Sequence, residues 1–336
     1  MNVVNGQWSV VNKNACGFVL CILLISLSVP APAQQTSKIP RIGWLAGNLP
    51  YTQTPRLEVL RRGLRELGYI EGKDVMIEAR YNQGKLDQLP ELAAELVRLN
   101  VDLIVAVGTQ AAQAAKSATK TIPIVATSGD PVANGLVASL ARPGGNVTGL
   151  ASLTFELAPK RLELLREAVP KLSRVAVLWN PDRRNSAQGL PETESAARSF
   201  GIKLQSVSSK GADGLQQAFS AMRKERAGAF ILLRSPLILS RLKQIVALAA
   251  QNRLPAMYDD GAFVEAGGLM SYGTLLADLD RRLATYVDKI LKGTKPGDLP
   301  VEQPKKFEFI INLKAAKQIG LTIPPNVLAR ADKVIR

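Results

Sequence analysis

A short polar segment that follows an apolar run in the first half of the chain is the first candidate for chemistry. Gly108, Thr109 and Gln110 come directly after the β-branched run at 103–107 and open an Ala-rich helical stretch. Because a helix begins with free N–H groups and a partial positive charge, this segment could hold an anionic group such as a carboxylate. The alternative is an ordinary helix start that Thr109 caps.

The next apolar run leads into a second polar segment. Ser128, Asp130 and Pro131 follow the run at 122–126, and Asp130 is one of few carboxylates expected at the end of a strand. It could receive an ammonium or hydroxyl group of a ligand. Its alternative role is that of an N-cap residue ahead of Pro131, which is the more common use of this arrangement.

Aromatic residues end two apolar runs in the second half of the chain. Trp179 is followed by Asn180, and Tyr258 is followed by Asp259 and a further acidic residue. A ring at a strand end can form one wall of a ligand site and stack on another ring or on a cation. Each ring could equally belong to the core, and adjacent acidic residues are most often solvated.

Trp44, near the end of the first apolar run, and Asn48, just after it, complete the candidate wall, with core packing as the alternative for Trp44. The predicted ligand-binding residues are therefore Trp44, Asn48, Gly108, Thr109, Gln110, Ser128, Asp130, Pro131, Trp179, Asn180, Tyr258 and Asp259. We predict no catalytic residue, no metal ligand and no cofactor.

The composition restricts the chemistry that this chain could perform. The sequence has no histidine, and its two cysteines, Cys16 and Cys21, both lie in the first 33 residues. This pattern excludes His-based triads and Cys/His zinc sites from the rest of the chain. A GxxxxGK[ST] phosphate loop is also missing. We therefore expect no enzyme; an exported enzyme that uses carboxylate, Lys, Tyr or Ser-Lys chemistry is the remaining catalytic alternative.

Short β-branched runs alternate with helical stretches from Ile39 onward, which is typical of βα units and parallel sheets. Four such units precede a turn-rich segment at 142–149, and four follow it. The runs are nearly all apolar, so we expect helices on both faces of each sheet. Because about eight parallel strands and a tail exceed one comfortable core, the pattern favours two Rossmann-like α/β lobes over one large sheet.

Residues 1–33 have the composition of a cleavable signal peptide. Lys13 is their only charged residue, an apolar or weakly polar run extends from Ala15 to Val29, and small residues occupy positions 31 and 33. We predict cleavage after Ala33 and a periplasmic mature protein. The alternative, a membrane anchor, needs about 20 apolar residues, which is longer than this run.

Basic residues outnumber acidic ones by 43 to 28, and the formal net charge is +15. A surplus of this size can indicate nucleic-acid binding. The basic residues are nevertheless scattered singly and in pairs such as Arg61-Arg62, usually close to an acidic residue. We expect solvated helix faces and no nucleic-acid partner; an anionic ligand or the anionic membrane surface could also benefit from the surplus.

Several motifs, taken in their order and spacing, resemble one family. They are Arg41-Ile42-Gly43-Trp44-Leu45, Gly63 to Tyr69 with Glu71-Gly72, Gly108 to Ala112, Asp130-Pro131-Val132, Leu140 to Gly149, Trp179-Asn180-Pro181 and Phe263 to Gly273. Over about Ile39 to Ile335, the chain resembles the substrate-binding proteins of ABC transporters related to tryptophan- and tyrosine-binding receptors.

The resemblance implies a type I periplasmic-binding fold, in which three strands cross between two lobes and the ligand lies in the cleft beside the hinge. Lobe 1 would comprise residues 39–152 and 273–293, and lobe 2 would comprise residues 153–272 and 294–336. In relatives, the loops that match Gly108 to Gln110, Ser128 to Pro131 and Trp179 to Pro181 contact the ligand.

The sequence therefore predicts a monomeric extracytoplasmic receptor that captures a small molecule by hinge closure and delivers it to an ABC permease in the inner membrane. An amino acid with an aromatic or branched side chain is the first candidate ligand. A periplasmic sensor that passes a signal to a membrane partner is the alternative that the sequence leaves open.

Overall fold

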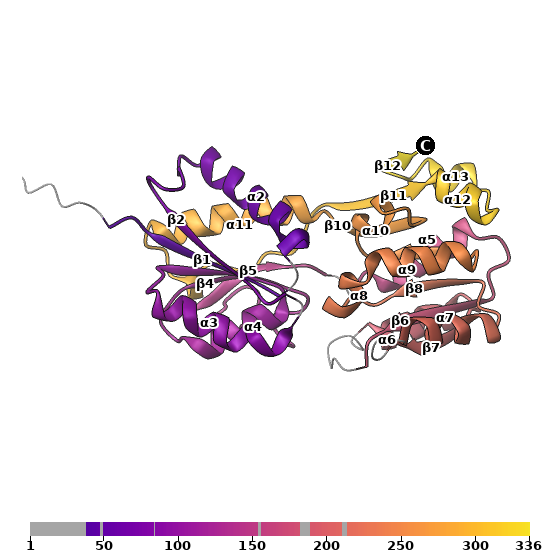
Figure 1. The fold of residues 1–336 in the computed structure, drawn as a ribbon, viewed down its shortest axis with the longest axis horizontal. Helices are drawn as coiled ribbons and strands as arrows, with labels where there is room; N and C mark the ends of the chain where they lie inside the picture. The colour runs from indigo at the N-terminus through magenta and orange to yellow at the C-terminus, as the bar shows by residue number, and fades with distance from the viewer. Residues whose placement is uncertain (1–37, 48–49, 84, 154–155, 182–188, 210–213) are drawn as a thin grey trace, which may run out of the picture. The chain divides into compact units, whose positions relative to one another are not determined.

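The computed structural model describes residues 38–47, 50–83, 85–153, 156–181, 189–209 and 214–336. The predicted signal peptide with its cleavage site, and the candidate residue Asn48, lie outside these described residues. The strands and helices of the described part follow the βα alternation that the sequence predicts, in two separate sheets (Figure 1).

The first sheet contains five strands within the described part, in the order β2-β1-β3-β4-β5, and all of them are parallel. The strands are β1 (Arg41–Ala46), β2 (Met76–Tyr81), β3 (Leu103–Val107), β4 (Ile124–Ser128) and β5 (Val147–Ala151). The central strands are buried almost throughout, whereas the edge strand β2 is largely half-buried. This difference is expected when helices cover both faces of a parallel sheet.

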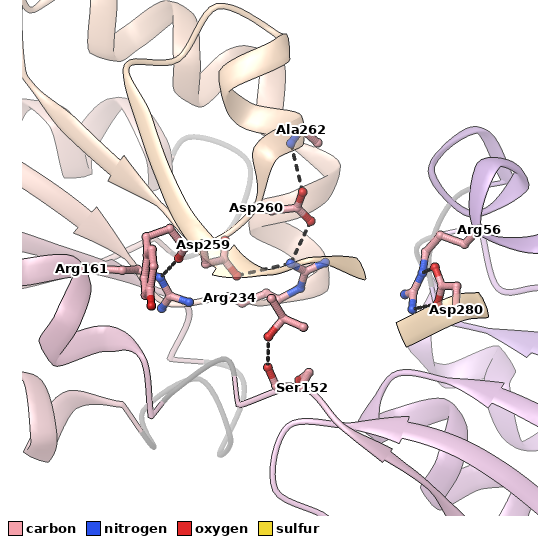
Figure 2. Close-up of polar contacts among 10 residues, drawn as sticks. Arg56, Ser152, Arg161, Arg234, Asp259, Asp260, Ala262 and Asp280 are labelled. Atoms are coloured by element: carbon pink, nitrogen blue, oxygen red, sulfur yellow. Dashed lines mark hydrogen bonds and ion pairs between the residues drawn. The ribbon is translucent and has the colours of Figure 1, made fainter. Parts of the chain in front are cut away.

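Helices cover both faces of the first sheet (Figure 1). The helices α2 (Pro50–Glu66) and α11 (Leu276–Leu291) pack on one face, and α3 (Leu89–Arg98) and α4 (Thr109–Ala118) pack on the other, with the 3₁₀ turn η1 (Leu86–Gln88) ahead of α3. Leu57, Leu60 and Leu64 of α2 are buried, whereas Leu67, which continues the same spacing just after the helix, is 41% exposed. Arg56 of α2 and Asp280 of α11 add a two-bond ion pair, with 2.5 Å between Nη2 and Oδ1 (Figure 2).

The second sheet contains seven strands within the described part, in the order β12-β11-β10-β9-β8-β6-β7. The strands are β6 (Arg174–Trp179), β7 (Lys203–Ser208), β8 (Ala229–Leu232), β9 (Ala256–Tyr258), β10 (Met270–Thr274), β11 (Phe307–Asn312) and β12 (Lys333–Ile335). The pair β10–β11 is antiparallel, and the other pairs are parallel.

Helices also cover both faces of the second sheet. One apolar cluster joins it to α5 (Ala158–Ala168), α6 (Leu190–Ser199), α12 (Leu313–Ile319) and α13 (Pro325–Leu328). The cluster on the other face includes α7 (Gly214–Lys224), α8 (Pro236–Ser240), α9 (Leu242–Gln251) and α10 (Gly261–Glu265). The two Rossmann-like α/β halves predicted from the sequence are confirmed.

The chain passes between the two sheets three times in the described part. It leaves the first sheet after β5, returns after β10 to form α11, and enters the second sheet again at β11 through the 3₁₀ turn η3 (Pro296–Asp298). Hydrogen bonds join these crossing segments: Thr274 Oγ1 donates to the Ser152 carbonyl at 2.6 Å (Figure 2), and the Leu275 N–H donates to the Lys306 carbonyl at 3.2 Å. The three predicted crossings are confirmed.

The segment that precedes the third crossing packs with the first sheet. Leu299 and Val301 belong to the apolar clusters of that sheet, and the Glu302 N–H donates to the Gly149 carbonyl. The predicted division placed these residues in lobe 2, so the contacts differ from it here. The reason is that the chain follows the edge strand β5 before it crosses.

Candidate functional site

Charged side chains gather where β8 and β9 of the second sheet end. Arg234 follows β8, and Asp259 and Asp260 follow β9. Figure 2 shows Nη1 of Arg234 directed at both carboxylates, at 3.3 Å from Asp259 Oδ2 and 3.0 Å from Asp260 Oδ2. Asp260 also caps α10, because its Oδ1 accepts a hydrogen bond from the Ala262 N–H at 3.0 Å.

These charges are held in a partly buried setting. The side chain of Asp259 is 1% exposed, that of Asp260 is 13% exposed and that of Arg234 is 25% exposed. Burial opposes the charged form of Arg234, but the two carboxylates outweigh it and raise its pKa above the ordinary value. Burial also opposes ionisation of Asp260, yet Arg234 and the Ala262 N–H outweigh it and lower its pKa.

A glycine of the neighbouring strand permits this arrangement. A Cβ atom at Gly273 of β10 would lie 2.1 Å from the Asp259 carbonyl oxygen, which is far inside a van der Waals contact. Only glycine therefore lets β10 come this close to the end of β9.

A second buried arginine lies in the same region (Figure 2). Arg161 of α5 is 1% exposed, and its Nε donates to the Tyr272 carbonyl of β10 at 2.7 Å. Burial lowers the pKa of Arg161 to about 10, although the charge of Asp259 works in the opposite direction. The guanidinium group therefore stays protonated at neutral pH, and the region holds two cations and two carboxylates.

Neither arginine is among the ligand-binding residues predicted from the sequence. Arg161 lies in a helix whose apolar spacing is carried by the surrounding leucines, so nothing in the pattern distinguishes it from a solvated residue. Arg234 has a detectable signal, because it directly follows a buried apolar run, as several of the predicted ligand-binding residues do.

In the first sheet, the predicted polar segment from Gly108 to Gln110 lies at the start of a helix, as the sequence predicts, but the helix is not capped as predicted. The helix α4 begins at Thr109, and Gly108 precedes it with φ 97°, a conformation that favours glycine. Its N-terminus has no side-chain cap. The predicted capping role of Thr109 is therefore wrong: its hydroxyl lies 3.1 Å from the Ser128 hydroxyl and accepts a hydrogen bond from the Gly129 N–H at 3.4 Å. Gln110 is half-buried.

Asp130 serves its own turn. Its Oδ1 accepts hydrogen bonds from the N–H groups of Val132 at 3.1 Å and Ala133 at 2.9 Å. Pro131, which follows Asp130 in the sequence, is buried. The alternative role as a helix N-cap is also wrong, because residues 131–135 form a turn and not a helix, and the carboxylate closes that turn. Its carboxylate is occupied locally, so it is a weaker ligand candidate than the hydroxyl pair of Thr109 and Ser128.

Two of the three predicted wall rings lie in the core. Trp44 and Tyr258 are each 0% exposed: Trp44 packs under α2 and α11, and the Tyr258 ring stacks on Phe263 with 4.7 Å between centroids. We correct the prediction for these two rings, because both belong to the buried apolar clusters of the core, which was the alternative role for each. Trp179 is half-buried, with its indole N–H donated to the Ser206 hydroxyl at 2.8 Å, and Asn180 beside it is buried.

The described part lacks metal-binding clusters and membrane-spanning helices. No group of three or more acidic or cysteine side chains there could hold a metal ion. Also, none of the helices in the described ranges is sufficiently long and apolar to cross a bilayer.

Comparison with known proteins identifies the class of this molecule. Residues 56–335 match the model of a family described as ABC transporter substrate binding protein. The chain belongs to this family, and its architecture is the type I periplasmic-binding fold that the solved relatives share. Substrate-binding proteins of this family are extracytoplasmic, and membership implies a small-molecule ligand and a membrane transporter as partner.

Individual relatives extend over most of the chain. A tyrosine-binding protein of Clostridioides difficile is 29% identical over 275 residues, which cover 80% of this chain and 78% of that protein. A crystal structure of a conserved domain protein from Vibrio cholerae is 32% identical, with a TM-score of 0.83 and coverage of 88% and 100%. A Streptococcus pneumoniae ABC domain solved in complex with L-Trp is 28% identical, with a TM-score of 0.81 and coverage of 88% and 99%.

Proposed function

We propose that this protein is the periplasmic receptor of an ABC importer and that it captures an amino acid with an aromatic or branched side chain. Support for the ligand class comes from two relatives, of which one is described as tyrosine-binding and the other was solved with L-Trp. The leader composition of residues 1–33 supports export, with cleavage after Ala33.

The observation that carries the proposal is the location of the polar groups. In both sheets they follow the carboxyl ends of strands: Thr109 and Ser128 in the first sheet, and Arg234 and Asp259 in the second. In α/β sheets, ligands bind at this edge because loops and helix N-termini supply donors there. The half-buried indole of Trp179, at the end of β6, supplies the apolar contact that an aromatic or branched side chain needs.

The ligand would be shared by two lobes, one built on the first sheet and one built on the second, that close around it. The crossings at Ser152 and Thr274 lie at the same strand ends as the polar groups, so a hinge there would bring donors of both sheets to one ligand. Closure hides the ligand from water and changes the surface that faces the permease. The receptor would act as a monomer, because each copy contains both halves of its site.

A thermal-shift screen of the mature chain against the twenty amino acids and common organic acids tests this proposal. A specific ligand at 100 times its dissociation constant adds about 2.7 kcal/mol of stability, which raises the melting temperature measurably. We expect the largest shift with an aromatic or branched amino acid. If no compound in the panel shifts the transition, the proposed function is wrong.

Uptake of the radiolabelled amino acid by cells then tests the importer role. Deletion of the gene should abolish high-affinity uptake, and the full-length chain supplied in trans should restore it. Unchanged uptake together with specific binding in vitro would contradict import and would leave the protein a sensor.

A further inference from the structure

Arg234 differs from an ordinary surface arginine because two acidic side chains orient it. Nη1 donates to Asp259 at 3.3 Å and to Asp260 at 3.0 Å. Asp260 is itself fixed by its cap on α10, and Asp259 is 1% exposed. The guanidinium plane is therefore held from one side by groups that have little freedom to move.

The opposite side of the same guanidinium is available. Among the described residues, neither Nε nor Nη2 of Arg234 has a hydrogen-bond partner, and a quarter of the side chain is exposed. A pre-oriented guanidinium with free donors matches the two oxygens of a carboxylate in a bidentate geometry. Preorganisation of this kind increases affinity because little side-chain freedom is lost on binding.

We infer that Arg234 receives the carboxylate of the bound ligand and that Asp259 and Asp260 position it. This assignment rests on the proposed function and deepens it, since it defines the ligand as a carboxylic acid and gives Asp259 a positioning role in place of direct ligand contact. Asp259 suits that role: its Oδ1 is buried, whereas its Oδ2 faces Arg234.

The N-terminus of α4 is the competing anion receptor. It offers main-chain N–H groups and a partial charge beside the hydroxyls of Thr109 and Ser128. The charge of Arg234 is balanced by the two carboxylates beside it, so its advantage is geometric: they fix the guanidinium plane and leave its Nε–Nη2 edge for a planar carboxylate. We therefore assign the ligand carboxylate to Arg234, and we assign the ligand's other polar groups to the start of α4 with the hydroxyls of Thr109 and Ser128.

The test compares amino acids with their decarboxylated counterparts on the mature chain by isothermal titration calorimetry. The pairs are L-tyrosine with tyramine, L-tryptophan with tryptamine and L-leucine with isoamylamine. The wild-type protein should bind the preferred acid at least about 30-fold more tightly than the matching amine, which corresponds to loss of one buried charged partner. Arg234→Gln should lose at least about 30-fold in affinity for the acid and little for the amine, so that the preference disappears.

Two further variants keep the test decisive. Arg234→Lys retains the positive charge beside both carboxylates but lacks the planar fork, so it should fold and still lose about tenfold in affinity for the acid. Arg174→Gln is the matched control, because Arg174 is 26% exposed, pairs with Glu225 at 2.7 Å and lies at the start of β6, away from the strand ends. It should bind like the wild type.

The outcomes separate this assignment from the proposed function. If the wild type binds an amino acid and Arg234→Gln or Arg234→Lys binds it with unchanged affinity, the assignment is wrong and the receptor function stands. If Arg234→Gln lowers the affinity for the acid and for the amine by the same factor, the assignment is also wrong. If the wild type binds none of the amino acids, the proposed function fails, and the assignment fails with it.

Discussion

Asp259 and Asp260 are adjacent in the sequence, yet their surroundings give them different roles. Asp260 uses one oxygen to cap α10 and the other to pair with Arg234. Asp259 is more deeply buried, and its Oδ1 has no hydrogen-bond partner among the described residues. A buried carboxylate with an unpaired oxygen lowers the stability of the fold unless a fixed positive charge lies beside it, and Arg234 is that charge for Asp259. Because Asp260 contacts the same nitrogen of Arg234, the position of the guanidinium group depends on both carboxylates.

Acid titration should reveal the contribution of Asp260. Its pKa in the folded state lies below the value of 3.8 for an unperturbed aspartate, because Arg234 and the Ala262 N–H outweigh the opposing effect of burial. A lowered carboxyl pKa contributes stability that is fully present above about pH 5 and is lost as the pH falls through the folded-state pKa. Urea unfolding measured between pH 7 and pH 3 should therefore show a smaller loss of unfolding free energy for Asp260→Asn than for the wild type. If the unfolding free energies of the variant and the wild type fall in parallel with pH, Asp260 does not make this contribution.

Residue-level prediction from the sequence worked for position and failed for side-chain direction. The start of α4 at Thr109 and the strand end at Trp179 are where the apolar runs predict them. Trp44 and Tyr258 lie in strands that are buried on both faces, so alternation gives no indication of which way a ring points. Arg234 could have been found, because it follows a buried run, whereas Arg161 could not.

At the scale of elements, one glycine controls how closely β4 and β5 approach. Gly149 has φ 138°, and a Cβ atom there would lie 2.0 Å from the carbonyl oxygen of Ala126. Both the backbone conformation and the contact exclude other residues. The position matters for the site because β5 leads directly into the first crossing at Ser152.

Gly149→Ala should lower the unfolding free energy by about 3 kcal/mol or more, since the methyl group must displace backbone atoms. Gly145→Ala is the matched control in the same turn-rich segment, because a Cβ there meets nothing within 4 Å. Chemical denaturation of both variants measures the difference. Equal stability of the two variants would show that β4 and β5 can separate without cost.

The two α/β halves and the helix faces could be predicted because long apolar stripes and strand runs have clear periods. The strand pairing at the end of the chain could not be predicted from the sequence. There, β11 joins the second sheet antiparallel to β10, and β12 has three residues, from Lys333 to Ile335. A strand that short has no readable alternation, and pairing direction depends on the path of the crossing and not on local sequence. The packing of Leu299 and Val301 with the first sheet depends on that same path.

For the whole molecule, capture by hinge closure requires that ligand binding move the two lobes. The three crossing segments are bonded to one another by short links such as Thr274 Oγ1 to the Ser152 carbonyl, so they should move as one hinge. Small-angle X-ray scattering of the mature chain should show a smaller radius of gyration when the preferred amino acid is added. An unchanged radius at saturating ligand would contradict hinge closure while leaving binding intact.

The most direct test of the central claim is a crystal structure of the mature chain grown with the amino acid that gives the largest thermal shift. We predict electron density for the ligand at the carboxyl ends of the strands, with its polar groups within hydrogen-bond distance of Thr109, Ser128 and Arg234. A ligand bound elsewhere on the chain, with these side chains in contact only with water, would contradict the account.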